Sequence, residues 1–586
     1  MTVHGSGRLA DQLRTQVTDE SVDIDVCCRD SVKAFRDAAS TGFEIPSNVP
    51  VVYVTVDQGN VVLLKARVRE CDPCPWCIRL YTTVTQERAV EQTQDEPRLL
   101  WAETDQDVLA TIIAAVQSLA GSEHERLVTI FDPESQASVT SSVVHSHPDC
   151  SHTMERTDVS RDRLRSPRLD YEFYDSKFGI IRDIEWIDRS YDSPWAGESD
   201  VAVVVCWAVN PAFPRFPDAA PSFEVSSGTN RIRSEAHIRA IMEGIERFVA
   251  FAPAPTGWIA KEADVPTPTV TPEEFHTYPA ERLARADFPF EAYAPSVEYN
   301  WVECTRLADD ATVSIPSDFV YLTPRAAEVP YLLDNNTSGC GAHHSIEAAT
   351  RNGVLELVER DAVMSHWYSQ ERKPHVDVES LPAWARYTLA PFRDSYEVHI
   401  VDITRYDGLP AVEACLVARD PETVPAFVIG AGCAPTRHAA IDSAITEVTG
   451  ILHLATVGGV LDTGERLDRS AVQETADHLR YYSQHDRLEY LAAFREPSTT
   501  IPYDRIDPGC GESLSEIVRR LADHGVRLFR RELTPQALMR AYDVRVVRTL
   551  SPDLVPMHFG HQLERIDHPE RGFDLEEIPA EPHPFA

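Results

Sequence analysis

Two stretches of the sequence combine an apolar helical pattern with a pair of acids three residues apart. They cover residues 240–251 (AIMEGIERFVAF) and 345–362 (SIEAATRNGVLELVERDA). Arginine follows each pair; the residues are Glu243, Glu246 and Arg247 in the first stretch and Glu356, Glu359 and Arg360 in the second. Neighbouring like charges on a helix repel each other by roughly 0.3 kcal/mol. Because the pattern recurs, we expect a divalent cation to offset the repulsion, since Mg2+ binds carboxylate and phosphate oxygens.

The two arginines and the segments before the helices add anion affinity to this pattern. Arg247 and Arg360 carry planar forks that match phosphate oxygens. The segments SSGTNR and TSGCGAHH read as small-residue loops, whose amides and following helix N-termini attract phosphate. The combination indicates a magnesium–nucleotide site made by two helices, whereas a solvated acidic face is the alternative for either helix alone. The chain lacks the GxxxxGKS or GxxxxGKT of a P-loop and the HRD and DFG motifs of protein kinases.

Strands and helices must alternate to position these residues. The segments VAVVVCWAV, YEVHIVDIT, AVEACLVAR and AFVIGAGCA have the apolar, β-branched character of strands. The last of them leads into a third helix, TRHAAIDSAITEVTGILHLA, so the order strand, small-residue loop, helix occurs three times. We therefore expect an α+β core with internal pseudo-repetition. Nearer the N-terminus, VPVVYVTV and NVVLLKARV around DQGN predict a hairpin, and QDVLATIIAAVQSLAG predicts a helix that ends at Gly121.

Composition divides the chain into three parts. We expect an N-terminal α/β domain at 1–155, a polar linker at 156–170 and the main domain at 171–586. The N-terminal part contains CDPCPWC and HSHPDCSH, which predict a structural Zn2+ site with the ligands Cys74, Cys77, Cys150 and His152, and Cys71 in reserve. A redox-active CxxC pair is the alternative. Isolated cysteines in apolar strands indicate a reduced, cytoplasmic protein.

The charge balance excludes several classes of partner. The chain has 93 acids against 55 bases and a net charge of −38, so it should repel nucleic acid and anionic membranes. The scarcity of lysine favours a halophilic origin, with an acidic cytosolic enzyme as the alternative. The first twenty residues contain no signal-peptide h-region. The longest aliphatic run, residues 201–209, is far shorter than the roughly 20 residues that span a bilayer.

The paired motifs resemble those of a known family. SGCGAHHSIEAATRNGVLELVERDAVMSHW is similar to the second ATP-binding signature of the YcaO family, and SEAHIRAIMEGIERF is similar to the first. VVRTLSPDLVPMHFGH and the terminal PHPFA resemble the azoline-forming branch, the D component of thiazole/oxazole peptide cyclodehydratases. The resemblance covers about residues 165–586 and implies a YcaO-type ATP-binding core of mixed sheets and helices.

The resemblance also implies a reaction. Such enzymes bind ATP and Mg2+ and phosphorylate a peptide backbone amide oxygen. A Cys, Ser or Thr side chain of a ribosomally made precursor peptide then attacks the preceding carbonyl, and thiazoline or oxazoline forms as phosphate leaves, as in bacteriocin biosynthesis. A thioamide-forming YcaO enzyme and a non-catalytic ATP-binding scaffold are the alternatives.

Site residues follow from the same resemblance. Its implied ligands of metal and nucleotide are Glu243, Glu246, Arg247, His344, Glu347, Glu356, Glu359, Arg360 and Arg548, with Glu447 as a further candidate. The chain departs from the usual motifs at Arg239, at His344 and in the register of Glu347.

Both ends of the chain resemble functional segments of this family. The tail PAEPHPFA forbids a helix; chain ends usually fray, but the resemblance implies entry into the active site, with Pro582, Pro584 and Ala586 as catalytic candidates. The N-terminal part resembles the zinc-bearing end of E1-like, ThiF-related partner proteins, so we expect docking or leader-peptide handling there. A separate leader-peptide-binding partner and a homodimer are also implied.

Overall fold

The computed structural model describes seven short segments of the N-terminal part and most of the chain after residue 172. The segments are 2–4, 25–28, 50–57, 60–67, 106–122, 127–131 and 138–141. After residue 172 the described residues are 173–585 except 177, 190–198, 214–220, 253–256, 323–330, 458–460, 462–465, 512, 536–537, 540–543, 561–562 and 569–577. The four predicted zinc ligands and the predicted linker lie outside these residues.

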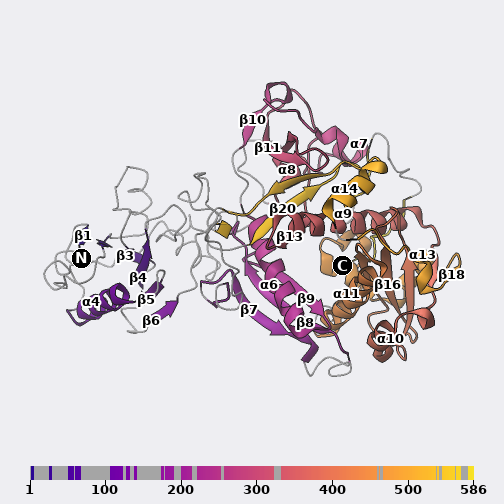
Figure 1. The fold of residues 1–586 in the computed structure, drawn as a ribbon, viewed down its shortest axis with the longest axis horizontal. Coiled ribbons are helices and arrows are strands. Elements are labelled where there is room, and N and C mark those ends of the chain that lie inside the picture. Colours follow the sequence, from indigo (N-terminus) through magenta and orange to yellow (C-terminus); the bar gives the residue numbers. More distant parts are fainter. Residues whose placement is uncertain are drawn as a thin grey trace.

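The N-terminal segments form one sheet with a helix, at the indigo end of the molecule (Figure 1). Its strands, in spatial order, are β1 (Thr2–His4), β2 (Asp25–Cys28), β3 (Pro50–Asp57), β4 (Asn60–Arg67), β5 (Leu127–Phe131) and β6 (Ser138–Ser141). The register joins Asp57 to Asn60, so the predicted hairpin is confirmed. Helix α4 (Gln106–Gly121) is confirmed with the predicted end.

The rest of the described chain contains three further sheets. The first contains β7 (Ile181–Trp186), β8 (Ala202–Val209) and β9 (Phe223–Asn230). The second contains β10 (Trp258–Ala260), β11 (Tyr299–Arg306), β12 (Thr312–Pro316), β13 (Cys340–His343), β19 (Phe529–Glu532) and β20 (Arg545–Leu550). The third contains β14 (His375–Val376), β15 (Tyr396–Asp402), β16 (Ala411–Ala418), β17 (Phe427–Cys433) and β18 (Thr500–Ile501).

Three long helices follow strands of these sheets directly, and shorter helices lie around them (Figure 1). The long helices are α6 (Arg233–Ala250), α9 (Ile346–Ser369) and α11 (Arg437–Val457). The shorter helices are α7 (Ala280–Leu283), α8 (Ser317–Val320), α10 (Ala383–Leu389), α12 (Thr475–Tyr482), α13 (Ala492–Arg495) and α14 (Leu514–Asp523). No helix in the described ranges combines the length and the apolar character needed to cross a bilayer.

Each long helix packs closely on the strand before it because that strand contains glycine. A Cβ at Gly341 would lie 2.3 Å from the carbonyl oxygen of Ala349, and Gly228 and Gly432 make equally close approaches to α6 and α11. The prediction of loops at SSGTNR and TSGCGAHH is therefore corrected: most of the first is strand β9, and CGAH of the second is strand β13. Their small residues serve helix–strand contact.

The C-terminal tail is buried and not frayed. Residues 582–585 are buried, and Phe585 joins an apolar core with a ring-to-ring distance of 6.2 Å to Phe494. This apolar anchor explains why a proline-rich chain end is held in place. Ala586 lies outside the described residues.

Candidate active site

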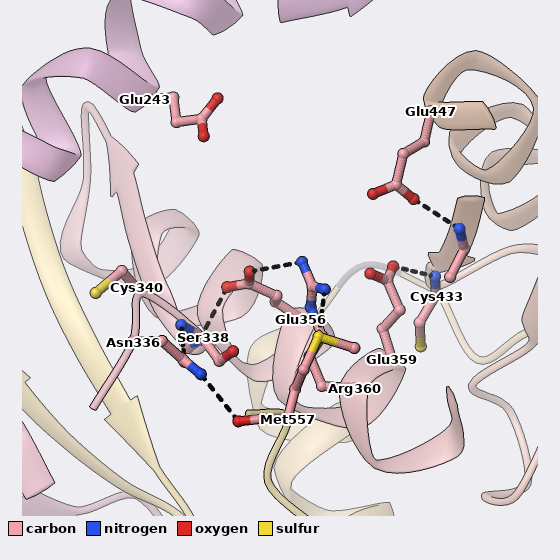
Figure 2. A network of polar contacts seen from close by, with 12 residues as sticks. Glu243, Asn336, Ser338, Cys340, Glu356, Glu359, Arg360, Cys433, Glu447 and Met557 are labelled. Carbon is pink, nitrogen blue, oxygen red and sulfur yellow. Dashed lines mark hydrogen bonds and ion pairs between the residues drawn. The ribbon is translucent and has the colours of Figure 1, made fainter. Parts of the chain in front are cut away.

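Acidic side chains of the three long helices are held by main-chain amides in, or next to, the strands that precede α6, α9 and α11. On α6, Glu243 Oε2 accepts a hydrogen bond of 2.9 Å from the N–H of Ser227 in β9. On α11, Glu447 Oε2 accepts one of 2.6 Å from the N–H of Ala431 in β17. Figure 2 shows Glu243 and Glu447 pointing from opposite sides toward a shared space. Each carboxylate keeps its other oxygen for a ligand or an arginine.

Helix α9 supplies two further carboxylates, which lie below that space (Figure 2). Glu356 Oε2 accepts a hydrogen bond of 2.9 Å from the N–H of Gly339, just before β13. Glu359 Oε2 accepts one of 2.9 Å from the N–H of Cys433, the last residue of β17. The hydrogen bond of Glu359 therefore connects α9 to β17, the strand that precedes α11. The predicted acids of the two helices are therefore brought together, and Glu447 joins them.

These carboxyl groups disfavour one another's ionised forms. Burial raises the pKa of Glu246 well above its ordinary value, and Glu356 and Glu243 add to the effect. Burial together with Glu447 raises the pKa of Glu359 to about 8. Burial also raises the pKa of Glu447. A bound cation would relieve this repulsion, which is the property expected of a metal site.

Arginines of α6 and α9 lie beside the carboxylates. Arg247 donates from Nε and Nη2 to Glu243 Oε1, at 3.2 and 2.8 Å. Arg360 Nη2 lies 3.6 Å from Glu356 Oε1, and Arg360 Nη1 lies 2.8 Å from the sulfur of Met557. The Nε of Arg360 is buried without a hydrogen-bond partner among the described residues. Thioether sulfur is a weak acceptor, so Arg360 retains donors for an anion.

The third predicted arginine reaches the same cluster from β20. Arg548 donates to the carbonyl oxygen of Asn336 at 2.6 Å and to Asn335 Oδ1 at 2.7 Å. Its charge acts to lower the pKa of both Glu246 and Glu356, so it lies near the carboxylates. Its Nε is also buried with no partner in the described chain. The site therefore brings acids and arginines together, as nucleotide phosphates with Mg2+ require.

One buried acid was missed in the sequence. Asp361, the residue after Arg360, is fully buried. It accepts hydrogen bonds from the N–H of Val555 at 2.8 Å and from Tyr406 at 3.0 Å, and it forms an ion pair of 2.9 Å with Arg405. These contacts fix the chain just before Met557 and thereby hold it against Arg360.

Two other predicted ligands lie elsewhere. Glu347 is exposed and lines a separate cavity of about 420 Å3 with Leu514 and Val518. His344 is exposed, with its ring 5.6 Å from that of His343. Glu347 lies in the first turn of α9, whereas the clustered acids of that helix lie more than two turns further along.

The tail approaches the arginine side of the cluster. Tyr482 donates a hydrogen bond of 2.6 Å to the carbonyl oxygen of Pro582. The ring of His583 stacks on His478, with centroids 4.1 Å apart. Burial lowers the pKa of His583 well below its ordinary value, and the charge of Arg360 contributes in the same direction. The tail therefore lies within electrostatic range of the site.

The donor set of the site fits Mg2+ with phosphate better than a metal held by protein alone. Among the described residues, no three His, Cys, Asp or Glu side chains form a group that could ligate one ion. Mg2+ commonly takes one or two carboxylates and completes its shell with phosphate oxygens and water. The carboxylates facing the space in Figure 2 meet that requirement.

Comparisons with known proteins agree with this geometry. A model of the family described as YcaO cyclodehydratase, ATP- and Mg2+-binding, matches residues 227–555. An uncharacterized protein of Methanothermobacter thermautotrophicus is 26% identical over 359 residues, which are 58% of this chain and 84% of that protein. A structure titled heterocyclase in complex with substrate and cofactor has a TM-score of 0.69 at 16% identity, covering 100% of this chain and 85% of that one. The heterocyclase TruD gives 0.60 at 16% identity, covering 100% and 84%.

Proposed function

The chain belongs to the YcaO family of ATP- and Mg2+-binding cyclodehydratases, and from this premise we propose that it forms azolines in a ribosomally made precursor peptide. One observation carries the proposal. Carboxylates of three helices, each fixed by a main-chain amide, meet beside two arginines that keep unsatisfied donors, Arg360 and Arg548. Both structural neighbours are heterocyclases, which supports a peptide-cyclising reaction.

Roles for individual residues follow from the contacts of each. Glu243, Glu246, Glu356 and Glu359, with Glu447 as a further candidate, are proposed to hold Mg2+ ions together with the nucleotide phosphates, with no more than two of these carboxylates on one ion. Arg247, Arg360 and Arg548 are proposed to hold the phosphates as forks. Mg2+ supplies neutralisation of phosphate charge. His344 and Glu347 are exposed and lie away from the carboxylates. We propose that they contact a part of the nucleotide other than the phosphates.

The proposed reaction balances as follows. The terminal phosphoryl group of ATP passes to the oxygen of a peptide amide, which leaves ADP. The Sγ or Oγ of the next Cys, Ser or Thr releases its proton to solvent and bonds to the amide carbon, whose double bond to the phosphorylated oxygen becomes single. The C–O bond then breaks, the oxygen departs with phosphate, and the amide nitrogen loses its proton as the C=N bond of the ring forms. The peptide loses one water in sum, and the site's own contribution is to position the phosphates and balance their charge.

The remaining proposals concern organisation. Glu243, Glu356 and Glu447 each follow the strand glycine of their unit by 15 residues, which supports internal pseudo-repetition. We propose that Pro582, Pro584 and Ala586 act in catalysis from the tail. We further propose that residues 1–155 bind zinc and handle docking, ahead of a linker at 156–170 and the catalytic domain at 171–586. We also propose that the protein forms a homodimer and works with a separate leader-peptide-binding partner. Its proposed setting is the cytoplasm of a halophile.

The test is a reaction with a defined substrate. The full chain is incubated with ATP, Mg2+ and a Cys-, Ser- and Thr-rich precursor encoded beside its gene. We expect mass spectrometry to show loss of one water per ring and equal consumption of ATP. Glu356→Gln should abolish the loss, whereas Glu235→Gln, an exposed acid on α6, should retain it. Exchange of oxygen for sulfur when sulfide is added would instead identify thioamide formation, and ATP binding without turnover would identify a scaffold.

A further inference from the structure

A second cavity adjoins the carboxylate site on its arginine side. It has a volume of about 50 Å3 and is lined by Arg360 of α9, Arg548 of β20 and Arg565. Asn336 and Ser338 supply polar groups to the same lining. None of the carboxylates of Figure 2 lines it. A small cavity with guanidinium groups from three separate parts of the chain is suited to an anion.

Arg565 is the residue of this cavity that the proposed mechanism does not use. Its side chain is 92% buried, since only 8% of the residue is exposed. Within the described residues it has neither a hydrogen bond nor an ion pair, although Glu564 before it and Asp567 two residues after it are both fixed. Glu564 forms an ion pair of 2.5 Å with Arg282, and the main chain of Asp567 pairs with that of Thr277 at 3.0 and 3.1 Å. The guanidinium is therefore held in place without a counter-ion.

The charge of Arg565 is poorly compensated. Burial lowers its pKa below the ordinary value, and repulsion from Arg548 adds to this. The charge of Asp334 acts on Arg565, but the two residues form no ion pair. The Nε atoms of Arg360 and Arg548 are buried and unsatisfied as well. A buried cation without a partner is costly. Arg565 without a partner, together with the unsatisfied Nε donors of Arg360 and Arg548 at the same cavity, indicates a missing anion.

The size of the cavity limits that anion. One water needs roughly 10–15 Å3 of such volume, so the cavity holds about three to five water-sized groups. That number matches the oxygens of a tetrahedral oxyanion. A nucleoside is far too large for this space. The lining also offers hydrogen-bond donors on several sides, as a tetrahedral ligand requires.

We propose that the cavity lined by Arg360, Arg548 and Arg565 binds inorganic phosphate, separately from the carboxylate site that holds the nucleotide. Arg360 and Arg548 border both places, so phosphate released beside the carboxylates reaches Arg565 without crossing bulk water. The phosphate-binding cavity stands on its own geometry, whereas its role in receiving the reaction's phosphate rests on the proposed function.

The experiment is a calorimetric titration of the full chain with inorganic phosphate, in the presence of a non-hydrolysable ATP analogue and Mg2+. We expect one phosphate per chain. Arg565→Gln should weaken phosphate binding at least about tenfold, because a charge-assisted hydrogen bond is lost. Arg565→Lys should weaken it less. Arg285→Gln, which removes an exposed arginine paired with Asp287, serves as the control and should change it less than about twofold.

The outcomes separate this inference from the proposed function. Phosphate binding that is absent, or unchanged in Arg565→Gln, would overturn the inference. Displacement of phosphate by the ATP analogue would also overturn it, since the cavity would then belong to the terminal phosphate of ATP. Affinity for the analogue itself should stay within about twofold in Arg565→Gln, and failure of the wild type to bind the analogue would count against the proposed function alone. Melting curves of Arg565→Gln and Arg565→Lys verify folding.

Discussion

Replacing Glu359 by glutamine should stabilise the ligand-free protein while removing its response to nucleotide. Glu359 has a pKa of about 8, against an ordinary value of 4.5, because burial and Glu447 disfavour its ionised form. The unfolded chain ionises this carboxyl group near pH 4.5, whereas the folded protein keeps it protonated up to about pH 8. Stability is therefore lost as the pH rises through this window. Glutamine cannot ionise, yet it keeps an oxygen that can accept from the N–H of Cys433.

The expected magnitude follows from this difference. At pH 8 the difference between the folded and unfolded pKa values of Glu359 lowers the free energy of unfolding by about 4 kcal/mol. Solvent in the half-buried site screens about half of it, which leaves about 2 kcal/mol. At pH 5 the same treatment leaves about 0.5 kcal/mol. If about 400 residues unfold together, the gain at pH 8 raises the melting temperature by about 2 °C.

The assay is thermal unfolding of wild type and Glu359→Gln at pH 5 and pH 8, with and without Mg2+ and ATP. Without ligand, the variant should melt higher, and more so at pH 8. Ligand at about 100 times its Kd should stabilise the wild type by about 2.7 kcal/mol and reverse the order. Glu235→Gln on the exposed face of α6 is the matched control and should melt like the wild type. A ligand-free Glu359→Gln protein that is no more stable than wild type at pH 8 would refute the reasoning.

Three other substitutions test how the site is positioned, each by urea unfolding. Asp361→Asn weakens the pair with Arg405 and should cost about 2 kcal/mol, so an unchanged midpoint would remove Asp361 from its positioning role. Gly341→Ala places a Cβ 2.3 Å from the oxygen of Ala349 and should cost about 2 kcal/mol or more; a neutral effect would mean that α9 does not need this close approach. Phe585→Ala should cost about 3 kcal/mol by leaving a cavity under the tail, whereas a loss below about 0.5 kcal/mol would indicate a tail that adds nothing to the core.

The sequence predicted which helices bring the acids together better than it predicted the contacts that position them. Recurrence of the acid pairs with arginine identified α6 and α9, because a surface explanation weakens when a costly pattern repeats. Glu243, Glu356 and Glu447 each follow a strand glycine by the same number of residues. This equal spacing is a signal from which Glu447 could have been predicted as firmly as the other two. The strand character of β9 and β13 was missed because glycine and serine are poor strand formers when read alone. Only the packing of a helix on the strand explains their presence.

Buried polar contacts between segments that are far apart in the chain could not be predicted from the sequence. Asp361 lies three residues after Val358 on the apolar side of α9, which is a signal for a buried acid, but its partners come from far away in the chain. Arg565 carried no motif at all. The fate of the tail depended on Phe585, whose core partners lie on other elements. The zinc site and the halophilic origin stay predictions.

The central claim is that carboxylates of three helices hold Mg2+ and ATP together. Calorimetric titration of ATP into wild type, Glu447→Gln and Glu235→Gln, each with and without Mg2+, tests it most directly. We predict binding by wild type and Glu235→Gln only when Mg2+ is present, and a loss of at least about tenfold in Glu447→Gln. Equal, Mg2+-independent affinity in all three proteins would contradict the account.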